Sequence, residues 1–296
     1  MNAQLFRAPQ EADTLVVSYY PLVGNHENTG PRYQREAELT GFNVLGIIRD
    51  GTNTTDFDSH LRSALSPEHF DEYCADQAKE IQPQITDYDR VIFRGQSTGS
   101  FPTLGIVKTG NVRATHLLVE DGINLRTNRH GGNRGPLAAR WDWLKSTLDE
   151  RHAPENTFYE EMPKVEVPDD RPLAQKLLEI APAIGKGTLG FAAETYHWAP
   201  LWHSSYSSKA VKELGLKRPD LPILMKFIGH SGTATEAQVV AFQEIVEGIQ
   251  DHRYLRPNNT RIVAQFDENA WHNYLTFPGY GARNLRQVSR MLSLVV

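Results

Sequence analysis

The chain contains one stretch in which a hydroxyl nucleophile stands between two glycines at a spacing suited to nucleophilic catalysis. Residues 95–99 read GQSTG and match the pattern G-x-S-x-G. The apolar run Asp89–Arg94 leads directly into this stretch, and helix-compatible sequence at Pro102–Lys108 follows it. A sharp turn from strand to helix strains its central residue, and flanking glycines let the backbone pack closely. We therefore expect the Ser97 hydroxyl to stand clear at the carboxyl end of a strand, near a helix N-terminus.

The elements that position this serine alternate between strand-like and helix-like sequence. Short runs rich in apolar and β-branched residues predict strands at Leu15–Tyr20, Phe42–Ile48, Asp89–Arg94, His116–Val119, Pro222–Ile228 and Arg261–Phe266. Amphipathic or helix-compatible stretches predict helices at Pro31–Leu39, Ser66–Ile81, Pro102–Lys108, Thr235–Gln250 and Ala282–Val295. This alternation predicts the α/β class, with a mostly parallel central sheet and helices on both faces.

Glycines, prolines and a serine predict the boundaries of the first two helices. Residues 24–30 read GNHENTG, which predicts a loop, and Pro31 suits the first turn of the helix that follows. Gly41 is expected to end that helix. Ser66 is expected to cap the next helix, with Pro67 at its first helical position.

The alternation of strands and helices stops between about Thr127 and Asp220. Strand signals in this stretch are weak, its helices look short, and it contains Trp141, Trp143, Trp198 and Trp202. We interpret 127–220 as an inserted, mainly helical cap. The core of the protein is then formed by 1–126 and 221–296.

Composition favours one large globular domain with an inserted subdomain. The chain has 296 residues, of which 40% are hydrophobic and 23% charged, as in ordinary folded proteins. The net charge of −5 and the lack of a basic run argue against a nucleic-acid partner. The chain has no run of about 18 apolar residues, and its N-terminus has no basic segment followed by an apolar one. We therefore expect no membrane span, no signal peptide and a cytoplasmic location.

The sequence also argues against a metal ion or an organic cofactor. Cys74 is the single cysteine, which excludes a disulfide within the chain and a cysteine-based zinc site. No H-E-x-x-H occurs, and the scattered histidines form no set with metal-ligand spacing. No G-x-G-x-x-G follows a predicted strand, as a dinucleotide site requires.

Three features together resemble the α/β-hydrolase family: GQSTG at 95–99, the strand at 42–48 that ends in Arg49-Asp50-Gly51, and the late histidine His272. The resemblance covers roughly 14–126 and 221–296. It implies a mostly parallel sheet, with a cap often inserted after the sixth strand, which is where 127–220 falls. It also implies that Ser97 is the nucleophile. A serine needs a base within hydrogen-bond reach, and the family places that histidine after the last strand, where His272 stands.

The resemblance leaves the acid of the triad open. This group holds the imidazole in the correct tautomer and stabilises its charged form. The family usually places an aspartate after the seventh strand, but Gly232 occupies that position here. Some members place the acid after the sixth strand, where Glu120 and Asp121 stand. We expect Glu120, with Asp121 as the second candidate, because consecutive strand side chains point oppositely and only one can face the histidine. Glu236 and Asp267 are further candidates.

An oxyanion hole requires two backbone N–H donors. The resemblance implies that one comes from Thr98, the residue after the nucleophile. The other is expected in the loop after the first predicted strand, where Pro21 has no N–H and Tyr20 or Leu22 must donate. The Tyr20 ring either lines the acyl pocket or packs as an aromatic at the strand end.

These residues predict a serine hydrolase that cleaves a carboxylic ester, or a related amide or thioester, through a Ser-His-acid triad and an acyl-enzyme. The expected partner is a small-molecule acyl substrate. A second hypothesis is a non-catalytic α/β-hydrolase-fold protein that binds a ligand or a partner. The missing aspartate after the seventh strand and the absence of the family's His-Gly motif support that alternative. A third hypothesis uses the same triad for C–C bond cleavage or acyl transfer.

Overall fold

The computed structural model describes most of residues 2–122 and several shorter segments after residue 188. They are residues 2–21, 26–52, 54–122, 189–190, 192–194, 196–201, 204, 206–228, 236–244, 262–268 and 278–291. His272 and most of the predicted cap lie outside these residues.

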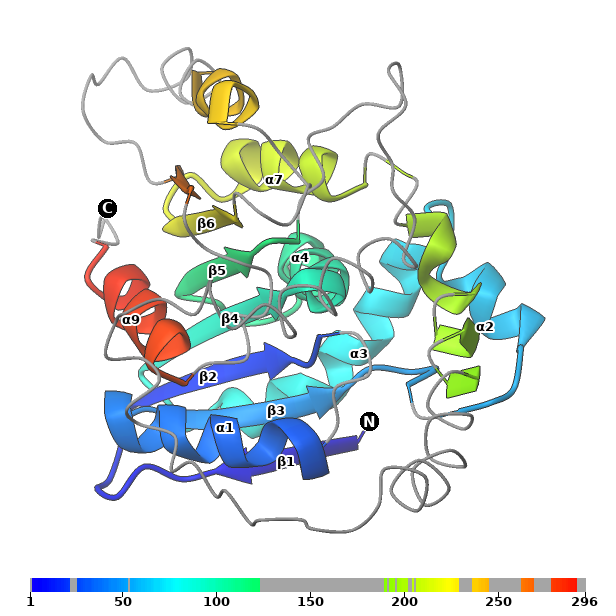
Figure 1. The fold of residues 1–296 in the computed structure, drawn as a ribbon. Helices are drawn as coiled ribbons and strands as arrows, with labels where there is room; N and C mark the ends of the chain where they lie inside the picture. The colour runs from blue at the N-terminus through cyan, green and yellow to red at the C-terminus, as the bar shows by residue number, and fades with distance from the viewer. Residues whose placement is uncertain are drawn as a thin grey trace, which may run out of the picture.

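Within the described residues, seven strands form one sheet in the order β1-β3-β2-β4-β5-β6-β7 (Figure 1). The strands are β1 (Asn2–Phe6), β2 (Thr14–Tyr19), β3 (Asn43–Ile48), β4 (Arg90–Gln96), β5 (His116–Glu120), β6 (Ile223–Ile228) and β7 (Ile262–Asp267). β1 pairs antiparallel with β3, and all the other pairs are parallel. The predicted, mostly parallel sheet is confirmed. The carboxyl ends of β2 to β7 therefore meet at one edge, which is where ligands bind in such sheets.

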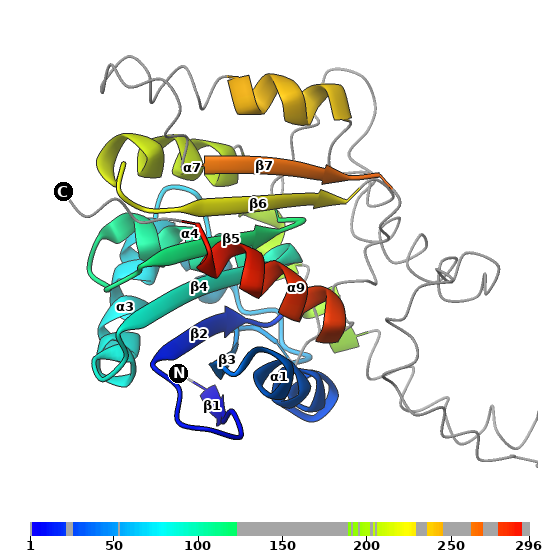
Figure 2. The same cartoon turned by 90° about the vertical axis from the view of Figure 1, so that its left-hand side faces the viewer.

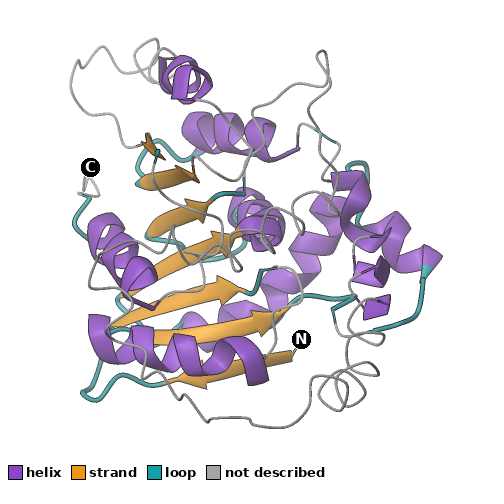
Figure 3. Cartoon of the chain, in the orientation of Figure 1, coloured by secondary structure: helices purple, strands orange, loops and turns teal. Residues whose placement is uncertain are grey.

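Helices cover both faces of the sheet (Figures 2 and 3). Helices α1 (His26–Thr40) and α9 (Pro278–Ser289) lie together on one face. The other face carries α3 (Phe70–Ile85), α4 (Ser100–Thr109) and α7 (Tyr206–Lys217). The short helix α2 (Ser59–Ala64) lies beside α3, and a 3-10 turn, η1 (Ser97–Gly99), joins β4 to α4.

The central strands are buried on both faces, which explains why they read as continuous apolar runs. Alternate residues of the strands contribute to two separate cores. The α1–α9 side buries Val16, Ile92, Leu118 and Leu224, and the α3–α4–α7 side buries Leu15, Phe93, Leu117 and Ile223. The side chains of β2, β4 and β5 on the α1–α9 side turn polar toward their carboxyl ends, with Ser18, Arg94, Gln96 and Glu120.

Two helix starts differ from the prediction. Helix α1 begins at His26 and includes Pro31, so the predicted loop at 24–30 is wrong from residue 26 onward. Gly30 packs on β1, because a Cβ at Gly30 would lie 3.2 Å from Phe6 Cζ. The helix continues through Pro31, which removes only one helical N–H.

Helix α3 begins at Phe70, not Ser66, because the Ser66 carbonyl accepts the N–H groups of His69 and Phe70 in a separate turn. The helix then continues past Pro83 to Ile85. Its buried residues Phe70, Cys74, Ala78, Ile81 and Ile85 keep helical spacing across the proline. Burial of this face outweighs the cost of the proline near the helix end.

The remaining differences lie near the chain ends and in the predicted cap. Helix α9 runs from Pro278 to Ser289, so it begins and ends earlier than the predicted Ala282–Val295. Strand β1 and helix α2 have no counterpart in the prediction. Within the predicted cap, α7 packs against α4 and leads into β6, while 123–188 lies outside the described residues. The cap boundaries stay a prediction.

Candidate active site

Ser97 follows β4 directly and opens the 3-10 turn η1. Its φ is 50°, in the left-handed region that non-glycine residues rarely adopt. Ser97 is partly exposed, whereas its neighbours Gln96 and Thr98 are buried. The structure therefore has the strained strand-to-helix turn that GQSTG predicts, with the serine at the carboxyl end of a central strand.

The two glycines of the turn have no room for a side chain. A Cβ on Gly95 would lie 2.4 Å from Ser100 Cα. A Cβ on Gly99 would lie 2.5 Å from the carbonyl oxygen of Tyr19 and 2.9 Å from that of Tyr20. The turn therefore packs directly on the carboxyl end of β2. This close approach is the physical reason for glycine at both positions.

The carboxyl end of β5 lies beside this turn. Gln96 and Glu120 are register partners, so Asp121 follows β5 where Ser97 follows β4. The Asp121 N–H donates to the Lys226 carbonyl at 2.7 Å. A Cβ on Gly122, the next residue, would lie 2.8 Å from the Ser97 carbonyl oxygen. Asp121 is 3% exposed and has a φ of 51°, so the chain leaves the strand sharply at this residue.

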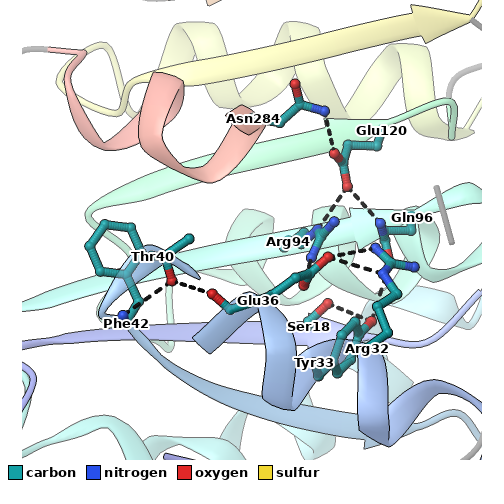
Figure 4. Close-up of polar contacts among 10 residues, drawn as sticks. All are labelled: Ser18, Arg32, Tyr33, Glu36, Thr40, Phe42, Arg94, Gln96, Glu120 and Asn284. Atoms are coloured by element: carbon teal, nitrogen blue, oxygen red, sulfur yellow. Dashed lines mark hydrogen bonds and ion pairs between the residues drawn. The ribbon is translucent and has the colours of Figure 1, made fainter. Parts of the chain in front are cut away.

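Both carboxylate oxygens of Glu120 are engaged by buried donors (Figure 4). Oε2 accepts from Arg94 Nε at 2.7 Å and from Gln96 Nε2 at 2.8 Å. Oε1 accepts from Asn284 Nδ2, on α9, at 2.6 Å. Burial alone would raise the pKa of the Glu120 carboxyl, but Arg94 and the bond from Asn284 hold it below its ordinary value.

Glu120 is one end of a buried chain of alternating charges, which we call the Arg94 network: Arg32, Glu36, Arg94 and Glu120 (Figure 4). Arg94 Nη1 donates to Glu36 Oε2 at 2.5 Å, and Arg32 Nε donates to Glu36 Oε1 at 3.0 Å. Burial lowers the pKa of Arg94, but Glu120 and Glu36 more than offset this and raise it. Two cations and two anions compensate each other, which is how a protein tolerates buried charge.

The sequence analysis missed the Arg94 network. A signal for it was present, because Arg94 lies inside an apolar strand and a charge buried there must have a partner. The identity of the partners was not accessible, since Glu36 and Asn284 belong to α1 and α9. Glycine at position 281 lets α9 pack against Glu36, because a Cβ there would lie 1.9 Å from Glu36 Oε1.

Tyr20 is fully buried, and its N–H donates to the Ile47 carbonyl at 3.1 Å. Its ring lies 4.9 Å from the Tyr33 ring, and a Cβ on Gly46 would meet the Tyr20 hydroxyl at 2.5 Å. The ring is therefore packed between β3 and α1, as expected of an aromatic at a strand end. Its N–H already serves the β2–β3 ladder, so it is poorly placed to serve an oxyanion as well.

Of the other predicted site residues, the structure describes Thr98 but not His272 or Leu22. Thr98 is 1% exposed and follows Ser97 within η1. His272 and Leu22 lie outside the described residues. In the sequence, His272 falls between the last residue of β7, Asp267, and the first of α9, Pro278. Its pairing with Ser97 stays a prediction.

An open, polar cavity of about 470 Å³ lies between β6, β7 and α9. Desolvation, with Arg283 nearby, lowers the pKa of the Lys226 amine there to about 8. The lining residues are Lys226, Gln265, Phe266, Asp267, Glu268, Arg283 and Gln287. Two basic and two acidic side chains line the cavity, so their charges cancel and do not favour an ion of either sign. We assign no ligand to this cavity.

The described residues offer neither a metal site nor a membrane-spanning helix. They contain no group of three or more His, Cys, Asp or Glu side chains placed to hold a metal ion. None of their helices is both long and apolar enough to cross a membrane.

The chain resembles known proteins in its three-dimensional structure. No protein-family profile and no curated protein sequence matches it. The hydrolase olei00960 from Oleispira antarctica superimposes with a TM-score of 0.56 at 12% identity, over 97% of this chain and 94% of that one. YbtT, the type II thioesterase of the yersiniabactin NRPS/PKS biosynthetic pathway, gives 0.55 at 13% identity, over 98% and 97%.

The N-formylmaleamic acid deformylase from Pseudomonas putida S16 gives a TM-score of 0.54 at 12% identity, over 97% of this chain and 94% of that one. Each match spans almost the full length of both chains. At 12–13% identity such likeness establishes the fold and leaves the activity open. On the sheet order, the serine turn and these superpositions, the chain has the fold of the α/β-hydrolase superfamily.

Proposed function

We propose that the protein is a serine hydrolase that cleaves a carboxylic ester or a related acyl bond. The observation that carries this proposal is the strained backbone of Ser97, with a φ of 50°, at the carboxyl end of the central strand β4. Strain of this kind persists only where the surrounding structure imposes it, and it is concentrated at functional sites. Two of the structural neighbours, by name a thioesterase and a deformylase, give the proposal support from the fold.

In the proposed mechanism Ser97 Oγ attacks the acyl carbon while His272 accepts its proton. The N–H of Thr98 and a second backbone N–H stabilise the oxyanion. Because the Tyr20 N–H is engaged by Ile47, we assign the second donor to Leu22. His272 then protonates the leaving group, and water releases the acyl group in a second attack. This scheme uses no metal ion and no organic cofactor.

We assign the orienting acid to Asp121 in preference to Glu120. Glu120 accepts from Arg94, Gln96 and Asn284, and Arg94 already neutralises its charge. A carboxylate bound in this way has little charge left to stabilise an imidazolium. Asp121 follows β5 beside the serine turn and is one residue nearer to the carboxyl edge. Glu120 remains the alternative, with the Arg94 network then acting on the triad directly.

The test is covalent labelling with a fluorophosphonate, which reacts with activated serines. We expect the parent protein to be labelled at Ser97, Ser97→Ala to take up no label, and His272→Ala to be labelled far more slowly. Absence of label on the folded parent would overturn the hydrolase proposal and favour the non-catalytic binding protein. Product analysis after labelling succeeds would separate hydrolysis from acyl transfer or C–C cleavage by the same residues.

We expect Gly99→Ala to slow this labelling by about 100-fold, the order of loss that a displacement of about 1 Å causes at a reacting centre. The added Cβ would meet the Tyr19 carbonyl oxygen at 2.5 Å, so the turn must move away from β2. Gly110→Ala is the control. Nothing lies within 4 Å of a Cβ added at Gly110, so this variant introduces only the strain of its φ of 73°, whereas Gly99 has a φ of −61° and suffers the contact alone. Labelling of Gly99→Ala at the parent rate would contradict the packing argument.

A further inference from the structure

Residues 196–201, which we call the docked segment, are helical and are attached by side chains to the end of β3 and to α2. Trp198 Nε1 donates to the Asp50 carbonyl, just after β3, at 3.1 Å. Arg62, on α2, donates to the Tyr196 carbonyl, and its guanidinium carbon lies 4.4 Å from the Tyr196 ring centroid. These contacts hold the docked segment without using a group that titrates near neutral pH.

His197 adds a contact of a different kind, because its imidazole must be neutral to make it. The side chain is fully buried, and its Nε2 accepts the Asp58 N–H at 3.0 Å. A backbone N–H can only donate, so Nε2 carries no proton and the neutral ring has its proton on Nδ1. Nδ1 faces Gly51, since a Cβ on Gly51 would lie 2.7 Å from it. The ring is therefore enclosed between the turn after β3 and the start of α2.

Uptake of a proton by His197 breaks this contact. The imidazolium has an N–H on both ring nitrogens, so Nε2 and the Asp58 backbone nitrogen would present hydrogens to each other. The Asp58 N–H would lose its acceptor, and a positive charge would be left inside the protein. Burial lowers the pKa of the His197 imidazole for this reason, while Asp58 opposes the shift and Arg62 adds to it. The docked segment therefore binds a proton less tightly in place than when it is released into water.

The charged or titratable side chains on the elements around His197 are Arg49, Asp50, Asp56, Asp58, His60, Arg62 and Glu194. Three of the acidic groups have other partners. Asp58 Oδ1 caps α2 and accepts the His60 N–H at 2.8 Å, and Asp50 Oδ2 accepts a hydroxyl of α3 at 3.0 Å. Glu194 forms a buried ion pair with Arg49. The remaining one, Asp56, is exposed to solvent, so these surroundings favour the neutral imidazole.

We propose that His197 makes the attachment of the docked segment sensitive to pH. Above about pH 6.5, the ordinary pKa of imidazole, the ring is neutral and the segment is held in place. As the pH falls below this value, the released segment takes up one proton, and the attachment weakens by up to about tenfold per pH unit. Release withdraws Trp198 from Phe101 of α4, on which it stacks with ring centroids 6.5 Å apart. This inference goes beyond the proposed function and does not depend on it.

The test is hydrogen–deuterium exchange of the full chain, read by mass spectrometry at about pH 7.5, 6.5 and 5.5, on both sides of the ordinary pKa of imidazole. Protection compares the measured exchange rate with the intrinsic rate at the same pH, so the chemical pH dependence of exchange cancels. We expect peptides that cover 196–201 to lose protection by about three- to tenfold between the highest and the lowest pH, which one bound proton can supply. Peptides from β4 are the internal reference and should keep their protection.

His197→Gln is the main variant, because a glutamine carbonyl can accept the Asp58 N–H and takes up no proton near neutral pH. We expect it to protect the docked segment at the highest pH and to keep that protection at the lowest. His60→Gln is the matched control. His60 is a histidine of the same region, on α2, but its side chain is exposed. This variant should lose protection as the parent does.

Three results would overturn the proposal: constant protection in the parent, an equal loss of protection in His197→Gln, or its absence in His60→Gln. If His197→Gln is already unprotected at the highest pH, the pH profile of the parent decides. A loss that begins near pH 6.5 supports His197 as the titrating group. A loss that begins only below about pH 5 follows the titration of carboxylates and contradicts the role of His197. None of these results depends on whether Ser97 reacts with a fluorophosphonate.

Discussion

Replacing Asp121 with asparagine is expected to lower the rate of fluorophosphonate labelling at Ser97 by about 10⁴-fold, the loss that the same exchange causes in serine proteases. Asparagine keeps the size of the side chain but presents an amide, which stabilises the wrong tautomer of the histidine. Asp121 lies beside the serine turn, and its backbone is fixed by the bond to Lys226. The fold should therefore survive the exchange, and thermal unfolding of Asp121→Asn checks this.

Glu120→Gln is the contrasting variant for this experiment. It removes a charge from the Arg94 network, so we expect a clear loss of stability. The labelling rate of the folded variant should stay within about tenfold of the parent rate. In our assignment Glu120 does not contact the imidazole, so its replacement should slow labelling far less than loss of the triad acid. The reverse ranking, with Glu120→Gln losing the larger factor, would identify Glu120 as the acid and contradict our assignment of Asp121.

Local sequence patterns predicted those parts of the fold that local physics determines. Apolar runs located the buried strands, because a strand covered on both faces has little choice but to be apolar. GQSTG predicted the strained turn, because close contacts within the turn and with β2 require glycine at positions 95 and 99. The predicted starts of α1 and α3 were wrong: α1 includes Gly30 and Pro31, and α3 begins only after a separate turn at Ser66.

The polar framework of the site could not be predicted in the same way. Arg94 and Glu120 are 26 residues apart in the sequence, Arg94 and Glu36 are 58 apart, and Arg49 and Glu194 are 145 apart. No periodic pattern links such pairs, and only the topology of the sheet and its helices brings them together. The choice between Glu120 and Asp121 stays a prediction for this reason: the sequence shows two adjacent carboxylates but not which of them an arginine already holds.

Replacing Arg94 with methionine is expected to lower the free energy of unfolding by about 3–5 kcal/mol at pH 7, the usual cost of breaking a buried ion pair. Glu36 keeps its partner Arg32, but Glu120 retains only the neutral donors Gln96 and Asn284. Arg94→Met combined with Glu120→Gln leaves no charge stranded at this position, so most of the loss should be recovered. Urea unfolding of the two variants and the parent measures both effects, and equal losses in the two variants would contradict the role of the stranded charge.

The pH dependence of these variants gives an independent check on the sign of the effect. In the parent, Arg94 holds the pKa of Glu120 below its ordinary value, so ionised Glu120 stabilises the fold above the unfolded-state pKa of about 4.3. That contribution is lost as the pH falls through the folded-state pKa. In Arg94→Met the neutral donors Gln96 and Asn284 remain, but the charge that offsets the burial of Glu120 is gone, so we expect its pKa to rise above the ordinary value. The sign then reverses, because the folded state binds the proton more tightly than the unfolded one. The difference in unfolding free energy between the parent and Arg94→Met should therefore become smaller as the pH falls from 7 toward 4. The difference in unfolding free energy between the parent and the double variant should change less over the same pH range. No carboxylate remains at position 120 of the double variant, so none can take up a proton there.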